Sequence, residues 1–498
     1  MQRRFIRNLA LLLSLNLLIK PFWILGIDRA VQNSVGDGTY GFFLSIYSYS
    51  FLFYILLDLG ITNYNNRNIA QNNQLLSKYF AGIAGLKMLL SLLYAAVIFG
   101  IGILIGYDGA QLKLLGWVAF NQVLLSFILY LRSNISGLLL FKVDSIFSIL
   151  DRLLMILICS FLLWSGFVTG PFQIEWFVYA QTAAYIITLI AAFVFVIKHA
   201  GRILPSFQWP FMLAIIRKSL PYALLVLLMS FYNRLEPVLI ERLLPAETGF
   251  VQTGIYGKAF RLLDAGNNIS LLFSVLLLPM FASMIKKRES VNQLVKLSFS
   301  IIFSMSMLVA ALSLAYSREL MELLYGLRDG EDLLAFNLRI EESAAVFRVL
   351  MGSFVSVSCT YIFGTLLTAN GNLAILNIVA GAGVVINVGM NFILIPGFEA
   401  MGAAWSSFTV QFVTAVIQLF IARKIFNLRF GKVFYFRVAA FSILLFASAM
   451  GSVFMPFHWI INFLSALIFG FILVFVTKMI EIKSILVLIT SAYGHVKK

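Results

Sequence analysis

Long apolar runs separated by short polar segments dominate this chain. Fourteen of the runs are long enough to cross a bilayer, for which a helix needs about 20 residues. They lie at residues 5–27, 41–60, 79–105, 114–140, 145–168, 176–197, 219–243, 252–283, 297–316, 346–368, 374–396, 401–422, 434–454 and 459–479. The pattern predicts an all-α, polytopic membrane protein of about fourteen transmembrane helices.

The composition supports a membrane protein and leaves little chain for a soluble domain. Hydrophobic residues make up 61% of the sequence and charged residues 12%, whereas a soluble domain carries roughly 25% charged residues. Lys20 and Pro21 interrupt the first run, and no small-residue cleavage site follows it. We therefore expect this run to be a retained helix and not a signal peptide.

The basic residues are distributed unequally between the two sides of the predicted membrane. With the N-terminus inside, 23 of the 37 Lys and Arg residues fall on the inner side, seven on the outer side and seven within the runs. The positive-inside rule then predicts that both termini are cytoplasmic. The net charge of +16 reflects this sorting, so we expect no nucleic-acid partner.

An internal repeat of low identity relates the first six runs to the next six. The matching segments are Ile27-Asp28-Arg29 with Ile240-Glu241-Arg242, Gly38-Thr39-Tyr40-Gly41 with Gly254-Ile255-Tyr256-Gly257, and, more weakly, Gly137-Leu138-Leu139-Leu140 with Gly364-Thr365-Leu366-Leu367. An even number of helices gives both copies the same orientation. We expect two six-helix lobes in parallel pseudo-repeat, at 1–200 and 201–425, with a central cavity, and two further helices and a cytoplasmic tail at 426–498.

The longest predicted outer loop, 317–345, is rich in carboxylates. It contains Glu319, Glu322, Asp329, Glu331, Asp332, Glu341 and Glu342. Such residues serve as acid and base in a membrane-embedded glycan polymerase or ligase. No histidine or paired motif accompanies them, so a solvated amphipathic cap is the favoured interpretation.

Seven basic residues lie inside predicted helices, where each costs at least ~2.5 kcal/mol if it faces lipid. They are Lys20, Lys87, Arg132, Arg152, Arg234, Lys258 and Arg261. The acids at comparable depth are Asp58, Asp151, Glu236 and Asp264. Even if every acid is paired, the interior keeps a net positive charge, which suits an anionic or phosphorylated cargo better than a cationic drug.

Spacing and neighbouring prolines point to particular residues. Lys258 and Arg261 share one face of a helix, with Asp264 one turn further. Lys20 directly precedes Pro21, and Arg234 lies close to Pro237. Because proline bends a helix, we expect the first and seventh helices to move during transport.

These considerations give a set of candidate site residues. The candidates for substrate binding are Lys20, Arg234, Lys258, Arg261, Lys87 and Arg132. Glu236, Asp264, Asp151 and Asp58 are candidates for coupling to protons or cations, or for simple counter-charges. Lys87, and Arg152 beside Asp151, fit a structural ion pair or a snorkelling side chain equally well.

Motifs for nucleotide or metal chemistry are missing from the sequence. It contains no G-x-x-x-x-G-K-[ST] loop, no H-E-x-x-H and no Cys/His cluster, and its three histidines lie far apart. We therefore expect no catalytic residues, no metal site and no cofactor.

The eleventh and twelfth runs carry a family resemblance. Asn387 and Asn391, followed by Leu394-Ile395-Pro396 and Gly402-Ala403-Ala404, resemble the signature of Wzx-type polysaccharide-biosynthesis flippases of the multidrug/oligosaccharidyl-lipid/polysaccharide (MOP) exporter superfamily. The Gly38–Gly41 motif and Asp58-Leu59-Gly60 with Arg67 look like the first hairpin of that family.

The resemblance implies a flippase of the bacterial inner membrane and not an enzyme. Its substrate would be an undecaprenyl-diphosphate-linked oligosaccharide, such as an O-antigen, capsule or exopolysaccharide repeat unit, moved to the periplasmic leaflet by alternating access. Its partners would be membrane lipids and other polysaccharide-assembly proteins. The alternatives are a MATE-like drug or cation antiporter, in which acids do the work, and the membrane-embedded polymerase or ligase.

Overall fold

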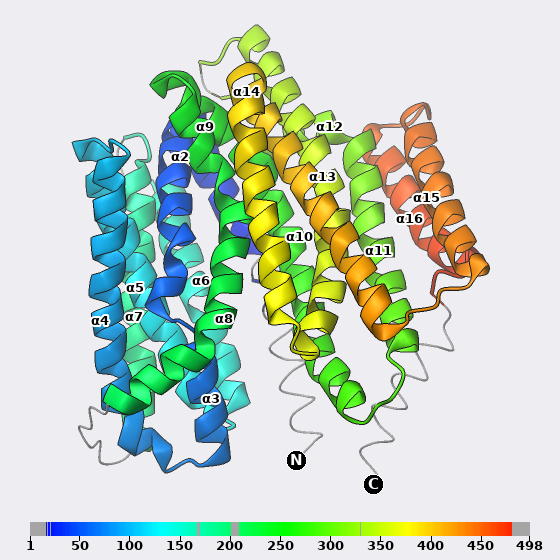
Figure 1. The fold of residues 1–498 in the computed structure, drawn as a ribbon. Helices are drawn as coiled ribbons and strands as arrows, with labels where there is room; N and C mark the ends of the chain where they lie inside the picture. Colours follow the sequence, from blue (N-terminus) through cyan, green and yellow to red (C-terminus); the bar gives the residue numbers. More distant parts are fainter. Residues whose placement is uncertain are drawn as a thin grey trace. The chain divides into compact units, whose positions relative to one another are not determined.

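The computed structural model describes residues 16, 18–19, 21–166, 170–200, 209–328 and 330–480, and within these residues it contains helices and no strand (Figure 1). The chain divides into two compact units, Met1–Gly254 and Ile255–Lys498. The predicted all-α, polytopic architecture is confirmed. The predicted lobe boundaries and the parallel repeat stay predictions.

Unit 1 is a bundle in which α5 is central, because it packs against α2, α3, α4, α6 and α7. Its elements are the π-helix η1 (Trp23–Asp28), α2 (Arg29–Leu52), the 3-10 helix η2 (Tyr54–Leu57), α3 (Ile61–Gln71), α4 (Leu75–Leu104), α5 (Gly109–Gly137), α6 (Phe141–Trp164), α7 (Ile174–Ala200), α8 (Trp209–Arg234) and α9 (Glu236–Leu243). A capping box of Asp108 and Gln111 fixes the start of α5.

Unit 2 is built around α13, which packs against α11, α12 and α14. Its elements are α10 (Ala246–Lys286), whose first residues belong to unit 1, α11 (Asn292–Ala315), α12 (Ser317–Leu324), α13 (Leu333–Ala369), α14 (Leu373–Phe426), α15 (Lys432–Val453) and α16 (Trp459–Val476). The last two helices pack together and against α11 through Leu308, Leu445 and Ala466.

Each of the fourteen predicted runs falls largely on helix within the described residues. Ten described helices are long and apolar enough to cross a membrane, and an eleventh span is counted if Tyr222–Arg234 of α8 and Glu236–Leu243 of α9, bent by 49°, cross it together. The 54-residue α14 reverses at Glu399, whose φ of 51° and ψ of −132° are not helical, and so contains two predicted runs. Gly36, with a φ of 82°, likewise separates the first two runs.

Two predicted outer segments differ from the structure. The stretch between the first two runs is not a loop, because α2 begins at Arg29 and only Gly36 makes the turn. Residues 317–345 contain α12 and the first part of α13. Asp332 caps α13 by accepting a hydrogen bond from the backbone N–H of Leu334. The first part of α2 and the helices within 317–345 contain many polar residues, so apolar runs alone do not predict them.

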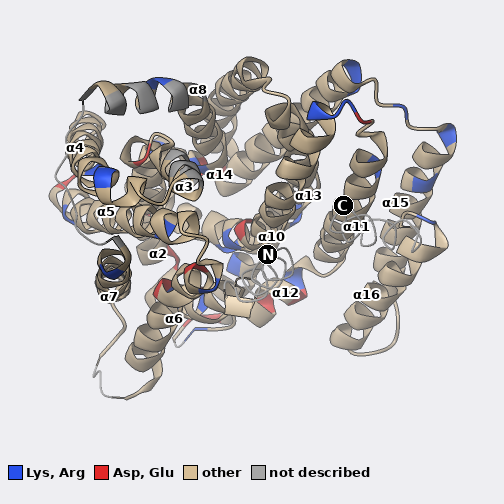
Figure 2. Cartoon of the chain, turned by 90° about the horizontal axis from the view of Figure 1, so that it is seen from below, with Lys and Arg blue, Asp and Glu red and all other residues tan. Residues whose placement is uncertain are grey.

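The exposed surface of the helices matches a lipid solvent. Large apolar side chains such as Phe436, Ile443 and Phe454 are 74%, 68% and 88% exposed. Figure 2 shows that Lys, Arg, Asp and Glu occupy only a small part of the helical ribbon in each unit. In water such a surface would be an aggregation hazard, so the protein is a multi-pass membrane protein.

Candidate functional site

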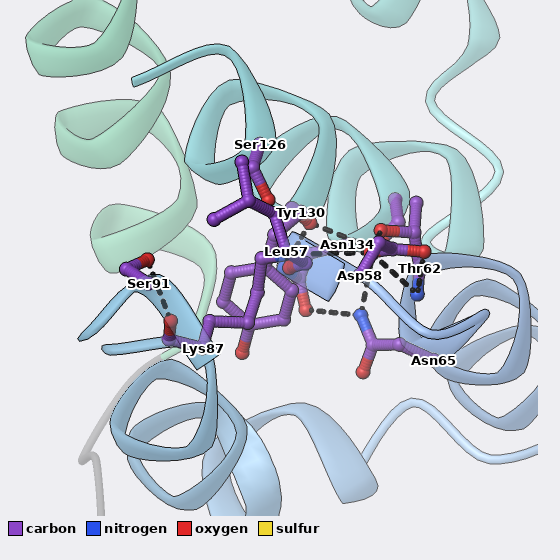
Figure 3. Close-up of polar contacts among 10 residues, drawn as sticks. Leu57, Asp58, Thr62, Asn65, Lys87, Ser91, Ser126, Tyr130 and Asn134 are labelled. Atoms are coloured by element: carbon purple, nitrogen blue, oxygen red, sulfur yellow. Dashed lines mark hydrogen bonds and ion pairs between the residues drawn. The ribbon is translucent and has the colours of Figure 1, made fainter. Parts of the chain in front are cut away.

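Asp58 and Lys87 form a buried ion pair in unit 1. The Lys87 side chain is 0% exposed, and its Nζ lies 2.9 Å from Oδ1 of Asp58. The same Nζ donates a second hydrogen bond of 2.9 Å to the carbonyl oxygen of Leu57 (Figure 3). Both contacts compensate the cost of removing the ammonium from water.

Two further sequence candidates in unit 1 lie beside carboxylates. Nε of Arg132, on α5, donates to Oδ1 of Asp144 in the first turn of α6, at 2.8 Å. Arg152 Nε lies 3.8 Å from Oδ2 of its neighbour Asp151. Its guanidinium also lies 5.6 Å from the ring centroid of Trp23. Binding of substrate by Lys87 and Arg132 stays a prediction.

Arg234 and Glu236 flank the break between α8 and α9. The helix axis bends by 49° at Leu235, two residues before Pro237, which confirms the predicted bend in this helix. The half-buried Arg234 places its guanidinium 4.4 Å from the ring centroid of Phe51, and Glu236 is 0% exposed. Two ionisable groups therefore lie at a bend in a membrane span, where ionisable residues mark functional sites by default.

In unit 2, the three predicted residues on one stripe of α10 differ in burial. Lys258 is 0% exposed, with Nζ 3.4 Å from Oγ of Ser343 and 5.3 Å from the ring centroid of Tyr325. Arg261 and Asp264 are half-buried. Lys258 is therefore packed inside unit 2, whereas part of the Arg261 side chain remains accessible.

Lys20, the remaining candidate, lies outside the described residues. The described residues contain no group of three or more His, Cys, Asp or Glu side chains that could hold a metal ion. The two asparagines of the signature, Asn387 and Asn391, are fully buried in α14, where Asn391 Nδ2 donates to the Asn387 carbonyl oxygen at 2.9 Å.

A polar cluster at the end of α9 was not among the predicted sites. Gln111 Nε2 donates to Glu241 Oε1 at 2.9 Å, and Arg242 Nη2 donates to Gln111 Oε1 at 3.2 Å. Arg242 also donates to the carbonyl oxygen of Ile105 at 3.1 Å and stacks on the Tyr107 ring at 4.4 Å. The repeated Ile-Glu-Arg segment was the available signal, but only the fold shows that it contacts the start of α5.

Sequence comparison assigns the chain to a family. The profile of the polysaccharide biosynthesis protein family matches residues 5–285, which is more than half of the sequence. The chain belongs to this family. A search of curated protein sequences finds no match.

Solved structures share the fold of this polysaccharide biosynthesis protein at low identity. The lipid II flippase MurJ, in an inward closed conformation, aligns with a TM-score of 0.67 at 13% identity, over 93% of this chain and 97% of MurJ. An inward-facing multidrug resistance MATE family transporter of the MOP superfamily aligns with a TM-score of 0.65 at 14% identity, over 84% and 98%. A MOP superfamily transporter from Pyrococcus furiosus gives 0.52 at 14%, over 84% and 94%.

These comparisons establish the family and the fold. The polysaccharide biosynthesis protein shares its fold with a solved MATE transporter of the MOP superfamily and with the lipid II flippase MurJ. The predicted polysaccharide-biosynthesis family is confirmed. At 13–14% identity the likeness concerns the fold and not the cargo.

Proposed function

We propose that this protein is a flippase that moves an oligosaccharide linked to undecaprenyl diphosphate from the cytoplasmic to the periplasmic leaflet of the bacterial inner membrane, with both termini cytoplasmic. The polysaccharide biosynthesis family supports the sugar part of this substrate, and the shared fold with a lipid II flippase supports the lipid part. Repeat units of O-antigen, capsule or exopolysaccharide have this chemistry, and the proteins that assemble them are the proposed partners.

The observation that carries the proposal is the partly accessible Arg261 on α10, one turn from the buried Lys258. An arginine in a membrane span is expensive unless it meets water, a partner or a ligand. Its guanidinium binds two phosphate oxygens at once, which a drug-like cation could not exploit. We assign diphosphate contacts during alternating access to Arg261 and Lys258 in unit 2, and keep Arg234 and Lys20 in unit 1 as separate candidates for such contacts.

The test is transfer of a lipid-diphosphate-linked oligosaccharide across reconstituted vesicles. Arg261→Ala should reduce the rate about tenfold or more, because a hydrogen bond to a charged group contributes about 1.5–3 kcal/mol. Lys286→Ala is the matched control, since Lys286 is exposed at the end of the same helix. Arg261 is preferred to Lys258, whose removal would also disturb its contact with Tyr325.

The same assay separates the flippase from an antiporter of the same fold. An antiporter would lose transport on Glu236→Gln or Asp264→Asn and tolerate Arg261→Ala. Wild-type protein that transfers no lipid-linked oligosaccharide, or Arg261→Ala protein that transfers it at the wild-type rate, would overturn the proposal.

A further inference from the structure

The second predicted helix of unit 1 is interrupted beside the Asp58–Lys87 pair. The α-helical backbone of α2 ends at Leu52, η2 follows, and regular helix resumes only at Ile61 in α3. Leu59 and Gly60, both with positive φ, at 44° and 81°, form the interruption. A break of this kind exposes backbone carbonyls that continuous helix would satisfy internally.

A backbone carbonyl, a carboxylate and two hydroxyl groups lie close together at the break. The Leu57 carbonyl accepts from Lys87 Nζ at 2.9 Å and from Ser126 Oγ at 3.1 Å (Figure 3). The Asp58 carboxylate accepts from Lys87 Nζ and from the hydroxyl of Thr62. Backbone carbonyls of an interrupted helix, together with a carboxylate, are the ligands by which transporters hold monovalent cations.

The Lys87 ammonium is the positive charge that lies among these oxygen atoms. Lys87 lies on α4 and brings its ammonium to the carbonyl and carboxylate oxygens, and its side chain is 0% exposed. One carboxylate balances one positive charge, so the site matches a monovalent and not a divalent ion. We propose that Leu57, Asp58 and Ser126 form a monovalent alkali-cation site in which the Lys87 ammonium is a tethered substitute for the cation.

Neighbouring contacts hold the oxygen ligands in place without Lys87. Asn65 on α3 donates to Ser133 Oγ at 2.8 Å and to Asn134 Oδ1 at 3.0 Å, which ties α3 to α5. The backbone N–H of Thr62 also points at Asp58, at 3.3 Å from Oδ1. Truncating Lys87 should therefore leave a polar cavity with its ligands still assembled.

If the Lys87 ammonium replaces a cation, the unfolding temperature of the Lys87→Ala variant should depend on which cation the salt contains. Thermal unfolding of purified full-length protein should be measured in lithium, sodium, potassium and choline chloride at equal ionic strength. Wild type should unfold at the same temperature in all four salts. Lys87→Ala should be less stable in choline and should regain several degrees in at least one alkali chloride, because binding to the folded state alone stabilises it.

Direct binding gives a second readout with a matched control. Lys87→Ala protein should bind radioactive sodium or rubidium that excess unlabelled ion displaces, and wild type should not. The double variant Asp58→Asn/Lys87→Ala, which lacks both charges, should lose the binding and the salt effect.

Three results would overturn the proposal. The first is that Lys87→Ala unfolds at one temperature in all four salts and binds no alkali ion. The second is that this variant yields no folded protein in any of the salts. The third is that the double variant binds the ion as well as Lys87→Ala does, since Asp58 would then be no ligand.

Discussion

Gly41 of α2 and Gly254 of α10 lie where the backbones of these helices touch within unit 1. A Cβ on Gly41 would lie 2.8 Å from the amide nitrogen of Gly254 and 1.9 Å from the carbonyl oxygen of Phe250. A Cβ on Gly254 would lie 2.2 Å from the carbonyl oxygen of Asp37. Backbone atoms cannot swing aside as a flexible side chain can, so glycine is required at both positions.

Gly41→Ala should therefore force α2 and α10 apart at this crossing. We expect a loss of about 1–3 kcal/mol in the free energy of unfolding, the usual cost of overpacking, measured as a lower melting temperature in detergent. Gly38→Ala is the matched control in the same motif, because its Cβ would meet only Val251 Cγ2, at 3.7 Å. Equal melting temperatures for the two variants would contradict this account of the crossing.

The repeated G-x-Y-G motif was visible in the sequence, but the different roles of its glycines were not. Gly38 and Gly41 are the two glycines of the same motif, and they differ in how close a Cβ at each position would come to the backbone of α10. The apolar runs likewise predicted the helices well, because each long helix must cover its length with apolar side chains in lipid. They placed a loop at residues 28–40, because the polar residues on both sides of the turn at Gly36 lie on helix and interrupt the apolar pattern.

Arg242 joins the end of α9 to the segment before α5. It donates to the carbonyl oxygen of Ile105 and to Gln111 Oε1, and its Nε lies 2.9 Å from Glu241 Oε2. Arg242→Ala removes these contacts and leaves the buried Glu241 without its ion-pair partner. We expect a loss of about 1–3 kcal/mol in stability, measured as a lower melting temperature in detergent.

Arg318→Ala provides the comparison for Arg242→Ala. Arg318 and its partner Glu341 are both more than half exposed, with 3.9 Å between Nη1 and Oε2. An exposed pair of this kind contributes about 0–1 kcal/mol, so the melting temperature should change little. If Arg242→Ala has as small an effect, the cluster at the end of α9 does not stabilise unit 1.

Pairing of the buried charges could be predicted only in part. Asp58 and Lys87 were both recognised as buried ions, but their contact across 29 residues depends on the break after η2. The place of Lys258 on α10 predicts contact with substrate, whereas its contact with Tyr325 depends on where the end of α12 lies in the fold. Hydropathy reports depth in the membrane and says nothing about which side chains meet.

Glu331 makes the stability of unit 2 depend on pH. Hydrogen bonds from Arg339, at 2.6 Å to Oε1 and 2.7 Å to Oε2, hold the pKa of this carboxyl below its ordinary value of 4.5. A depressed pKa in the folded state stabilises the fold above the ordinary value, and the stabilisation is lost as pH falls through the folded-state pKa. Glu331→Gln should therefore be less stable than wild type at pH 7, and the difference should shrink below about pH 4.5.

Melting temperatures of wild type and Glu331→Gln between pH 7 and pH 3 measure this effect. Glu322→Gln, at an exposed position on α12, is the control and should follow wild type throughout. A Glu331→Gln protein that stays below wild type by the same amount at every pH would show that the loss arises from packing and not from the charge of Glu331.

Substitutions of Arg234 test whether transfer requires a positive charge at the bend between α8 and α9. Its guanidinium stacks on Phe51, a geometry that a lysine ammonium cannot reproduce, because stacking uses the planar group. In the vesicle assay Arg234→Lys should keep part of the transfer of lipid-diphosphate-linked oligosaccharide, and Arg234→Glu should abolish it, because a carboxylate repels the diphosphate.

Arg217→Glu makes the same change of charge at an exposed position of the same helix. It should transfer substrate close to the wild-type rate, since its side chain is not at the bend. If Arg234→Glu also transfers normally while remaining folded, Arg234 does not contact the diphosphate. The positive charge at this bend would then serve the helix itself, by its contact with Phe51, and the substrate contacts would have to come from the other basic residues.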